Sequence, residues 1–435
     1  MYRITLHFLI LVSLVACQKQ QKEEALFVEQ IPAETNITFT NVVNQNGDNN
    51  VLNYPYFFNG GGVAAGDFNN DGLIDLYFSG NQVSNKLYIN KGNFKFDDIT
   101  DKAGVALKEG WKTGVTLADV NQDGWLDIYV CRSAMGDSLL RRNQLFINNK
   151  NLTFSEQAKH YGLADQSYST QAAFFDFDKD GDLDAFILNH SLPQFAGFSK
   201  LLAQGKNKRG DKFGSKLFRN DNGHFIDVSD KAGLINNVLS FGLGVAISDL
   251  NNDGWPDLYI SNDFNEEDYL YINNGDGTFK NTIKEATGHV SLFSMGSEIV
   301  DINNDGLTDI FTLDMMPETN ERIKLSSGDD NYDKYRMLID AGFHHQSMRN
   351  MLQLNNGNGS FSEVGQLAGI SNTDWSWAPL FADFDGDGYK DLFISNGYEK
   401  DYTNMQFLKF TMDEQIKSRQ TGVAPDMRVI MDKMP

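Results

Sequence analysis

The sequence predicts an all-β fold, a β-propeller of four-stranded antiparallel blades. A nine-residue pattern, D-x-[DN]-x-D-G-x-x-D, occurs six times, and its copies begin 52 to 82 residues apart. Around the copies, strand signals and turn signals follow one another in a recurring order, which indicates one blade per repeat. A linear β-solenoid is the alternative architecture, although solenoid repeats are usually shorter.

The six nonapeptides have the chemistry of calcium loops. Oxygen-bearing side chains alternate at positions 1, 3 and 5, glycine at position 6 permits a sharp turn, position 7 offers a backbone carbonyl, and position 9 adds a carboxylate. Such ligands suit Ca²⁺ better than Mg²⁺, and the loops contain no His or Cys that would indicate zinc. Surface turns rich in Asp and Asn, without metal, are the alternative. The predicted ligands are Asp67, Asn69, Asp71, Leu73, Asp75, Asp119, Asn121, Asp123, Trp125, Asp127, Asp176, Asp178, Asp180, Asp182, Asp184, Asp249, Asn251, Asp253, Trp255, Asp257, Asp301, Asn303, Asp305, Leu307, Asp309, Asp383, Asp385, Asp387, Tyr389 and Asp391.

The loops differ from EF-hands at position 12. An EF-hand needs a glutamate there and a helix that follows. Here each loop runs into a β-branched and aromatic segment of strand length, which predicts a strand. Position 12 is occupied by Phe78, Val130, Ile187, Ile260, Thr312 and Ile394.

A second repeated element supplies the rest of each blade. Downstream of the first five loops the sequence has a strand, an Asn/Gly turn and another strand, which is a hairpin signal. A small or apolar strand precedes several loops, such as residues 61–67, 113–119 and 242–249. Each repeat therefore predicts four antiparallel strands, with the calcium loop between the first and the second. The hairpins begin the segments 87–105, 145–163, 217–234, 270–288 and 352–370.

Composition sets limits on partners. The 435 residues are 41% hydrophobic and 12% aromatic, which is enough for a sizeable core. Acidic residues outnumber basic residues 59 to 37, giving a formal charge of −22. This balance argues against a general nucleic-acid binder, whose affinity depends on Lys and Arg at phosphates. About six structural Ca²⁺ ions would offset roughly half of the negative charge.

The N-terminus predicts export. Residues 1–16 combine an early Arg3 with a short apolar run, which is typical of a secretory signal and too short to span a membrane. The run ends in Leu-Val-Ala-Cys, which resembles the lipobox of bacterial lipoproteins, with Cys17 as the lipidated residue. An ordinary signal peptide with a chance cysteine is the alternative. We expect residues 17–35 to form a flexible tether, no transmembrane helix in the mature chain, and a place on the bacterial cell envelope, at the outer membrane, on its periplasmic side or at the cell surface.

Taken together, these motifs resemble the FG-GAP/VCBS repeat family, the propeller type of the integrin α head. More narrowly, residues 36–400 resemble bacterial lipoproteins related to cartilage acidic protein, which often carry a C-terminal ASPIC/UnbV domain. The resemblance rests on the six nonapeptides, the LYINNG-type hairpins and segment 349–388. It implies a propeller of commonly seven blades, with Ca²⁺ held by the Asp and Asn residues named above.

The end of the sequence departs from this pattern. After the sixth loop comes one strand and then residues 401–435, which we expect to be irregular or helical, without a further hairpin. Segment 37–43 resembles a fourth strand and would close the last blade, which would still lack its third strand. We therefore expect a fragment of a longer protein, with a ring that is either open or six-bladed with an irregular seam.

The face opposite the calcium loops is the candidate ligand face. The connections between second and third strands are long there, and insertions on one face of a repeat fold often bind ligands. In repeat three the connection is rich in basic residues, which suits an anionic partner or simply balances nearby acids. Two tryptophans before the sixth loop would stack on a sugar or belong to the core. The candidate residues are Lys206, Lys208, Arg209, Trp375 and Trp377.

The predicted function is a non-catalytic binding, adhesion or assembly module with a protein or glycan ligand. The sequence has no Gly-x-Ser-x-Gly elbow, phosphate-binding glycine loop or HExxH motif. A carbohydrate-active protein, either a lectin or similar to a polysaccharide lyase, is the alternative. A lyase would need a base on the opposite face, where Tyr332, Tyr335, His344 and His345 are available. The two histidines, without a third ligand nearby, are weak candidates for a metal site.

Overall fold

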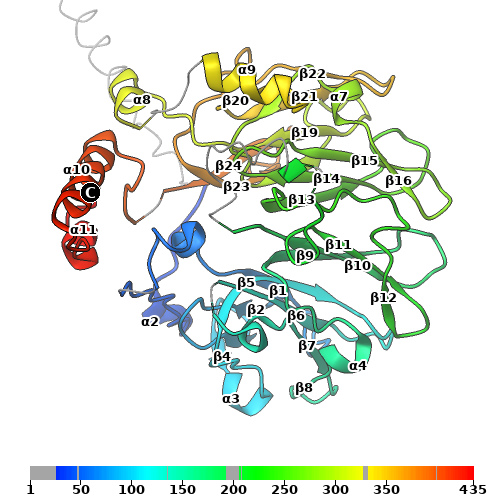
Figure 1. The fold of residues 1–435 in the computed structure, drawn as a ribbon. Coiled ribbons are helices and arrows are strands. Elements are labelled where there is room, and N and C mark those ends of the chain that lie inside the picture. Colours follow the sequence, from blue (N-terminus) through cyan, green and yellow to red (C-terminus); the bar gives the residue numbers. More distant parts are fainter. Residues whose placement is uncertain are drawn as a thin grey trace, which may run out of the picture.

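The computed structural model describes residues 26–46, 49–134, 136–192, 205, 206, 208–326, 332–397 and 399–435 (Figure 1). The predicted signal segment, Cys17 and the first part of the predicted tether lie outside the described residues. None of the helices in the described part of the chain combines the length and the apolar character needed to cross a membrane.

In the described part of the chain, five four-stranded antiparallel sheets and then one two-stranded antiparallel sheet follow one another along the sequence, and a short parallel pair of strands lies in a connection (Figure 1). In each four-stranded sheet the strands are neighbours in their sequence order, as blades of a propeller require. Blade 1 contains β1 (Val63–Gly66), β2 (Asp75–Phe78), β3 (Lys86–Asn90) and β4 (Phe96–Asp98); blade 2 contains β5 (Trp111–Ala118), β6 (Asp127–Ser133), β7 (Gln144–Asn148) and β8 (Phe154–Glu156); blade 3 contains β9 (Ser169–Phe175), β10 (Asp184–Asn189), β11 (Lys216–Asn220) and β12 (Phe225–Asp227). Blade 4 contains β13 (Gly242–Ser248), β14 (Asp257–Asn262), β15 (Tyr269–Asn273) and β16 (Phe279–Asn281); blade 5 contains β18 (Ser297–Val300), β19 (Asp309–Thr312), β21 (Met351–Asn355) and β22 (Phe361–Glu363); blade 6 contains β23 (Ser376–Ala382) and β24 (Asp391–Asn396).

The first strands of successive blades lie side by side, from β1 to β5, β9, β13, β18 and β23. The prediction of β-propeller blades is confirmed, and each nonapeptide loop joins the first strand of a blade to its second. β23 and β1 are not among these closely packed pairs.

The core consists of apolar layers between neighbouring blades. The aromatic residue at the centre of the second strand is a fixed part of these layers in the five complete blades. In blade 4, for example, Tyr259 packs with Leu250 of its own blade and with Ile310 of blade 5. These aromatic side chains are at most 1% exposed and are Tyr77, Tyr129, Phe186, Tyr259 and Phe311.

Helices occur in the connections. Short helices follow the fourth strand of three blades: α3 (Thr100–Ala103), α4 (Ala158–Tyr161) and α7 (Ile283–Ala286). The long connection of blade 5 contains α8 (Asn320–Ser326) and α9 (Tyr332–Asp340), and β20 (Gln346–Ser347) in it pairs in parallel with β17 (Val290–Ser291). The remaining helical elements are α2 (Pro32–Thr35), the 3₁₀ helices Pro55–Phe58 and Ser138–Arg141, α10 (Met405–Thr421) and α11 (Met427–Asp432).

Segment 37–43 corrects one expectation. It forms no strand and does not complete blade 6. Instead it lies against blade 1, where the backbone N–H of Thr38 donates to the hydroxyl of Tyr88 at 3.2 Å and the ring of Phe39 stacks on Phe78 at 5.1 Å. Its alternating pattern was compatible with a strand, but these aromatic partners hold it on the flank of the first blade.

Candidate metal loops and the opposite face

The six loops share one backbone conformation. Their glycines at position 6 have φ between +83° and +99°, and the residues at position 4 also lie in the left-handed region. The aspartate at position 1 organises the turn: in loop 4, Asp249 accepts the backbone N–H of Asp253 at 3.0 Å and that of Gly254 at 2.7 Å. The bond from the glycine to position 1 recurs in all six loops. The turn thus directs the side chains at positions 1, 3 and 5 toward a shared space, as the sequence predicts.

The aspartate at position 9 connects the loop to its blade. In blade 4, one oxygen of Asp257 accepts the N–H of Leu250 at 2.9 Å, and the other accepts the N–H of Asn273, at the end of the third strand, at 2.8 Å. Burial raises the pKa of Asp257 to about 6 and that of its counterpart Asp184 to about 7. A cation beside these carboxylates would favour their charged form and lower both pKa values.

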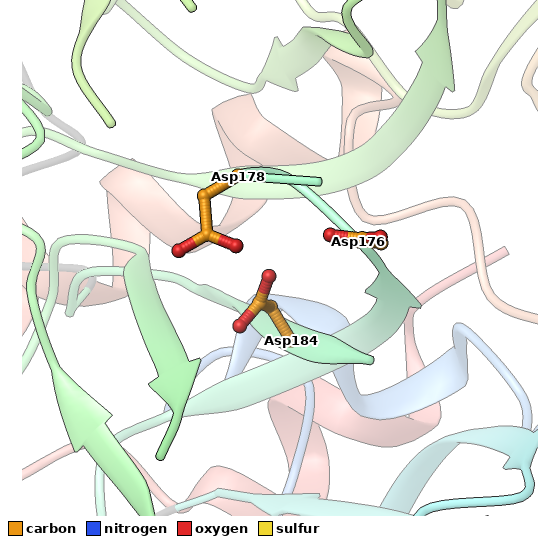
Figure 2. A group of neighbouring side chains, drawn as sticks. All are labelled: Asp176, Asp178 and Asp184. Carbon is orange, nitrogen blue, oxygen red and sulfur yellow. The ribbon is translucent and has the colours of Figure 1, made fainter. Parts of the chain in front are cut away.

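Two loops bring three carboxylates close enough to hold one ion. Oxygens of Asp176, Asp178 and Asp184 lie within 4.8 Å of one another, and Figure 2 shows these carboxylates facing a common space. In the same loop, Oδ1 atoms of Asp176, Asp178 and Asp182 are buried without a hydrogen-bond partner. Buried oxygens of this kind are costly unless a donor or a cation satisfies them, so the residues fit a hard cation such as Ca²⁺. Asp383, Asp385 and Asp391 form the corresponding group in loop 6.

The other four loops have asparagine at position 3. In loop 4, the side-chain amide of Asn251 donates to Asp253 at 2.8 Å, and its carbonyl oxygen accepts the N–H of Asp253 at 3.0 Å. These loops therefore contain one carboxylate fewer than loop 6 and two fewer than loop 3, and a hydrogen bond links the side chains at positions 3 and 5. In these four loops, hydrogen bonds from the N–H at position 5 link the side chains at positions 1 and 3, and binding of an ion stays a prediction.

Two sets of inter-blade contacts were missed by the sequence interpretation. The asparagine that ends the third strand donates its side chain to the preceding blade: Asn148 bonds to the carbonyl of Phe68 at 3.0 Å, and Asn273 bonds to that of Phe177 at 2.9 Å. At position 4, Gln122 bonds to the carbonyl of Gly181 in the next loop at 2.9 Å. The recurring Asn in the LYIN-type segments was the available signal, which we interpreted only as part of a turn.

Aromatic residues from the N-terminal segment cover the centre of the opposite face. Tyr54, Tyr56 and Phe57 are each at most 4% exposed, and they share an apolar cluster with Phe407 of α10 and Ile430 of α11. This cluster places residues from both ends of the described chain over the middle of the propeller.

A serine–histidine pair lies in this region. Ser133 Oγ is 2.6 Å from His190 Nε2, a spacing compatible with a nucleophile and its base. Both side chains are at most 2% exposed, however, and His190 Nδ1 faces the backbone carbonyl of Ser191 rather than a carboxylate. Burial lowers the pKa of His190 to about 4, so the imidazole is neutral. The pair is therefore a buried structural contact.

Three buried aspartates lie near these aromatic residues. Asp263 accepts the hydroxyl of Tyr56 at 3.1 Å, Asp268 accepts the hydroxyls of Tyr259 and Ser294, and Asp314 accepts several backbone N–H groups. Burial raises the pKa to about 7 for Asp263 and Asp268 and to about 6 for Asp314. The folded state therefore binds protons more tightly at these groups than the unfolded chain does.

We predict that Asp263→Asn weakens the dependence of stability on pH. Because the pKa of Asp263 is raised in the folded state, its contribution to the stability of the wild-type protein is complete below about pH 4 and is lost as the pH rises toward 7. A rise of the pKa from 3.8 to about 7 corresponds to about 4 kcal/mol. From pH 4 to pH 8, the free energy of unfolding of the variant should therefore increase by up to about 4 kcal/mol relative to that of the wild type. Urea unfolding of both proteins across this range measures the difference. The same dependence of the free energy of unfolding on pH in the two proteins would contradict the raised pKa of Asp263.

The predicted ligand-face residues fall into two groups. Lys206 bonds to Glu267 at 2.5 Å and lies over the ring of Phe343 at 3.9 Å, so it ties the blade 3 connection to blades 4 and 5. Arg209 is paired with Asp211 and Asp230, and Lys208 is exposed. The nearby acids balance these charges to a large extent, as in the alternative interpretation given above.

Trp375 and Trp377 form the second group. Their rings stack at 6.1 Å; Trp375 is 5% exposed, whereas Trp377 is only partly buried and donates to the carbonyl of Gly397 at 2.6 Å. Trp375 is therefore a core residue. The described residues around the cavities beside the two tryptophans do not include Lys206 or its basic neighbours.

Two of the cavities on the opposite face lie beside helices α9 and α10. The first, of about 450 Å³, lies beside α9, and its described lining contains Tyr332, Tyr335, Lys334, Arg349 and His344. His345 bonds to the hydroxyl of Tyr335 at 2.6 Å, and His344 bonds to Thr287 at 3.1 Å, so the two histidines have separate partners. The second cavity, of about 490 Å³, is mainly apolar and lies between α10 and residues such as Phe264, Phe293 and Met315.

Comparison with known proteins identifies FG-GAP-like repeats at residues 67–130, 249–312 and 340–394, which contain five of the six nonapeptides. Cartilage acidic protein 1 of Xenopus tropicalis is 27% identical over 207 residues, 46% of this chain and 28% of that protein. Its Mus musculus counterpart is 24% identical over 227 residues, 51% of this chain and 32% of that protein. The chain thus spans about a third or less of these relatives. A solved Agrocybe aegerita lectin, described as recognising non-reducing terminal N-acetylglucosamine, is 17% identical, with 77% of this chain and 70% of that chain covered and a TM-score of 0.37.

Proposed function

We propose, on the premise that this chain is built from FG-GAP-like repeats related to those of cartilage acidic protein 1, that it is a calcium-stabilised, non-catalytic binding module anchored to a bacterial envelope. Adhesion to, or assembly with, another protein or a glycan would be its activity. The six loops would hold about six structural ions, with the Asp and Asn side chains at positions 1, 3, 5 and 9 and the carbonyl at position 7 as ligands.

The buried, unpartnered carboxylate oxygens of loop 3 are the observation that carries this proposal. A cation would satisfy them, and the same turn is present in the other five loops. Bound ions would neutralise the carboxylates and hold the first and second strands of each blade at a fixed separation. The opposite face would then be a rigid platform whose long connections, 190–216 and 314–350, contact the ligand.

The envelope anchor is a separate part of the proposal. It rests on the sequence of residues 1–17, where Cys17 ends an apolar run. Metabolic labelling with a radioactive fatty acid tests it, with Cys17→Ala as the control variant. Label on the wild-type protein alone supports the anchor, and equal labelling of both proteins, or of neither, contradicts it.

A carbohydrate-active protein is the second candidate, and the cavity beside α9 favours it. Tyr332 and Tyr335 offer exposed rings for stacking on a sugar, whereas Lys334 and Arg349 bring positive charge that suits a carboxylate-bearing sugar. Arg349 also lies 3.6 Å from Glu363, so part of its charge is balanced within the protein. In a lyase, Tyr335 or His344 would serve as the base.

One experiment separates these functions. The purified, calcium-loaded protein is tested for saturable binding to an acidic polysaccharide and for release of unsaturated products, beside a Tyr335→Ala variant. Binding without products, weakened in the variant, indicates a lectin; product release indicates a lyase and overturns the non-catalytic proposal. Retention by bacterial surface proteins, with no binding to the polysaccharide, supports adhesion or assembly.

A further inference from the structure

β24 of blade 6 has one strand neighbour, whereas its five counterparts have two. In blade 5, for example, β19 lies between β18 and β21. In the described part of the chain, β24 pairs with β23 alone. The outer edge of β24 therefore presents backbone N–H and carbonyl groups that can pair with another strand.

The central aromatic side chain of β24 is also less buried than its counterparts in the other blades. Phe393 occupies the place of Tyr259 and Phe311, which are at most 1% exposed in their blades. Phe393 is 54% exposed. Burial of an aromatic side chain of this size against another strand is energetically favourable. β24 therefore offers apolar surface beside its open edge.

Asp391 indicates which strand belongs at this edge. In blades 1 to 5, one oxygen of the aspartate at position 9 accepts the backbone N–H of an asparagine that ends the third strand, at 2.7 to 2.8 Å. Asp391 accepts the N–H of Phe384 at 3.0 Å through Oδ2. No described N–H group occupies the second oxygen of Asp391.

Two carbonyl groups complete the expected contact. In blade 5, the side-chain amide of Asn355 donates to Leu250 of the preceding blade at 2.9 Å and to Thr308 of its own loop at 3.0 Å. Blades 2 and 4 repeat this arrangement. The equivalent carbonyls for blade 6 belong to Ile302 and Lys390. Together with Asp391 they form a receptor for a single asparagine.

We propose that the edge of β24 binds a β-hairpin whose first strand ends in asparagine, the class of hairpin found in blades 1 to 5. Its first strand pairs in antiparallel orientation with Leu392–Ile394, as residues 351–353 pair with 310–312 in blade 5. Its asparagine donates its backbone N–H to Asp391 and its side-chain amide to Ile302 and Lys390. This edge is distinct from the cavity beside α9, whose described lining contains no residue of β24.

The test supplies such a hairpin to the intact chain. A flexible Gly/Ser linker joins a second copy of residues 351–363 to the C-terminus; Pro435 lies beside Asp401, five residues after β24, which keeps the linker short. The matched control carries Asn355→Ala in the added copy only. A flexible tether gives an effective concentration on the order of mM, and hydrogen exchange at Leu392–Ile394 should slow by about tenfold with the asparagine copy.

The controls make each outcome decisive. Little slowing with the Asn355→Ala copy, and unchanged exchange in β19 of both proteins, support the proposal. A second pair, with residues 269–281 and an Asn273→Ala control, repeats the test with a different hairpin. Equal slowing by the asparagine and alanine copies, or no slowing in either pair, overturns it. Protection of β24 in the unmodified chain together with a dimeric mass would assign the edge to a second copy and would also overturn it.

Discussion

Removal of calcium is expected to lower the unfolding temperature of this protein markedly, and about six ions should be bound per chain. Each loop contributes RT ln(1 + [Ca²⁺]/Kd) to the stability of the folded state, which is about 2.7 kcal/mol at a concentration one hundred times Kd. The unfilled loops retain closely spaced carboxylates and, in loop 3, unpartnered oxygens of Asp176, Asp178 and Asp182. Calorimetry with millimolar Ca²⁺ and with chelator, combined with metal analysis, measures both quantities.

Two variants of loop 3 refine this expectation. Asp176→Ala removes the position 1 ligand and the acceptor of the Gly181 N–H, so we expect one ion fewer per chain. Asp178→Asn gives the loop the same residue at position 3 as loops 1, 2, 4 and 5, and it should keep its ion because the amide retains an oxygen ligand. Equal ion content in both variants, or an unfolding temperature that does not change when chelator is added, would show that the loops are turns without bound metal.

Asp257→Ala is expected to lower the free energy of unfolding by about 2–6 kcal/mol in the presence of chelator. It leaves the buried N–H groups of Leu250 and Asn273 without their acceptor, and each unsatisfied group costs about 1–3 kcal/mol. Chelator ensures that loss of a metal ligand does not contribute. Urea unfolding at about pH 4, where the raised pKa of Asp257 costs the wild type little stability, gives the free energies.

Asp391→Ala is the matched control for that variant. Asp391 holds the same position in its loop, is partly exposed and accepts only the N–H of Phe384 among the described residues. We expect a loss of about 1 kcal/mol or less. Similar losses in the two variants would mean that the bond to the third strand adds little, and would also weaken the hairpin receptor inferred for blade 6.

The local features of the blades could be predicted from the sequence because they depend on short-range rules. The turn requires a left-handed conformation that glycine at position 6 permits, and β-branched and aromatic runs indicate strands, so the strands on either side of the loops and the hairpins were predicted correctly. The destination of segment 37–43 could not be predicted. Its alternating pattern fits a strand, but its position depends on Phe78 and Tyr88, which lie 35 to 51 residues further along the chain.

The candidate ligand face was harder to predict for the same reason. A run of lysines in the sequence suggests an open basic surface, yet Lys206 bonds to Glu267, which is 61 residues away. Likewise, nothing near Trp375 in the sequence shows that the C-terminal Tyr402 packs against its ring at 5.3 Å. Charge balance and burial at these positions depend on pairings between distant repeats, and composition does not reveal them.

The asparagine contacts between blades also impose an order on folding. The carbonyl of Phe68 accepts its hydrogen bond from Asn148, which is synthesised 80 residues later, and that of Phe177 accepts from Asn273, 96 residues later. A blade therefore acquires its last hydrogen bonds only after the next repeat has left the ribosome. We expect the blades to become complete one after another from the N-terminus, so that the most recently synthesised blade is the least protected. A pause in synthesis would leave one incomplete blade at the growing end, while the blades before it remain complete.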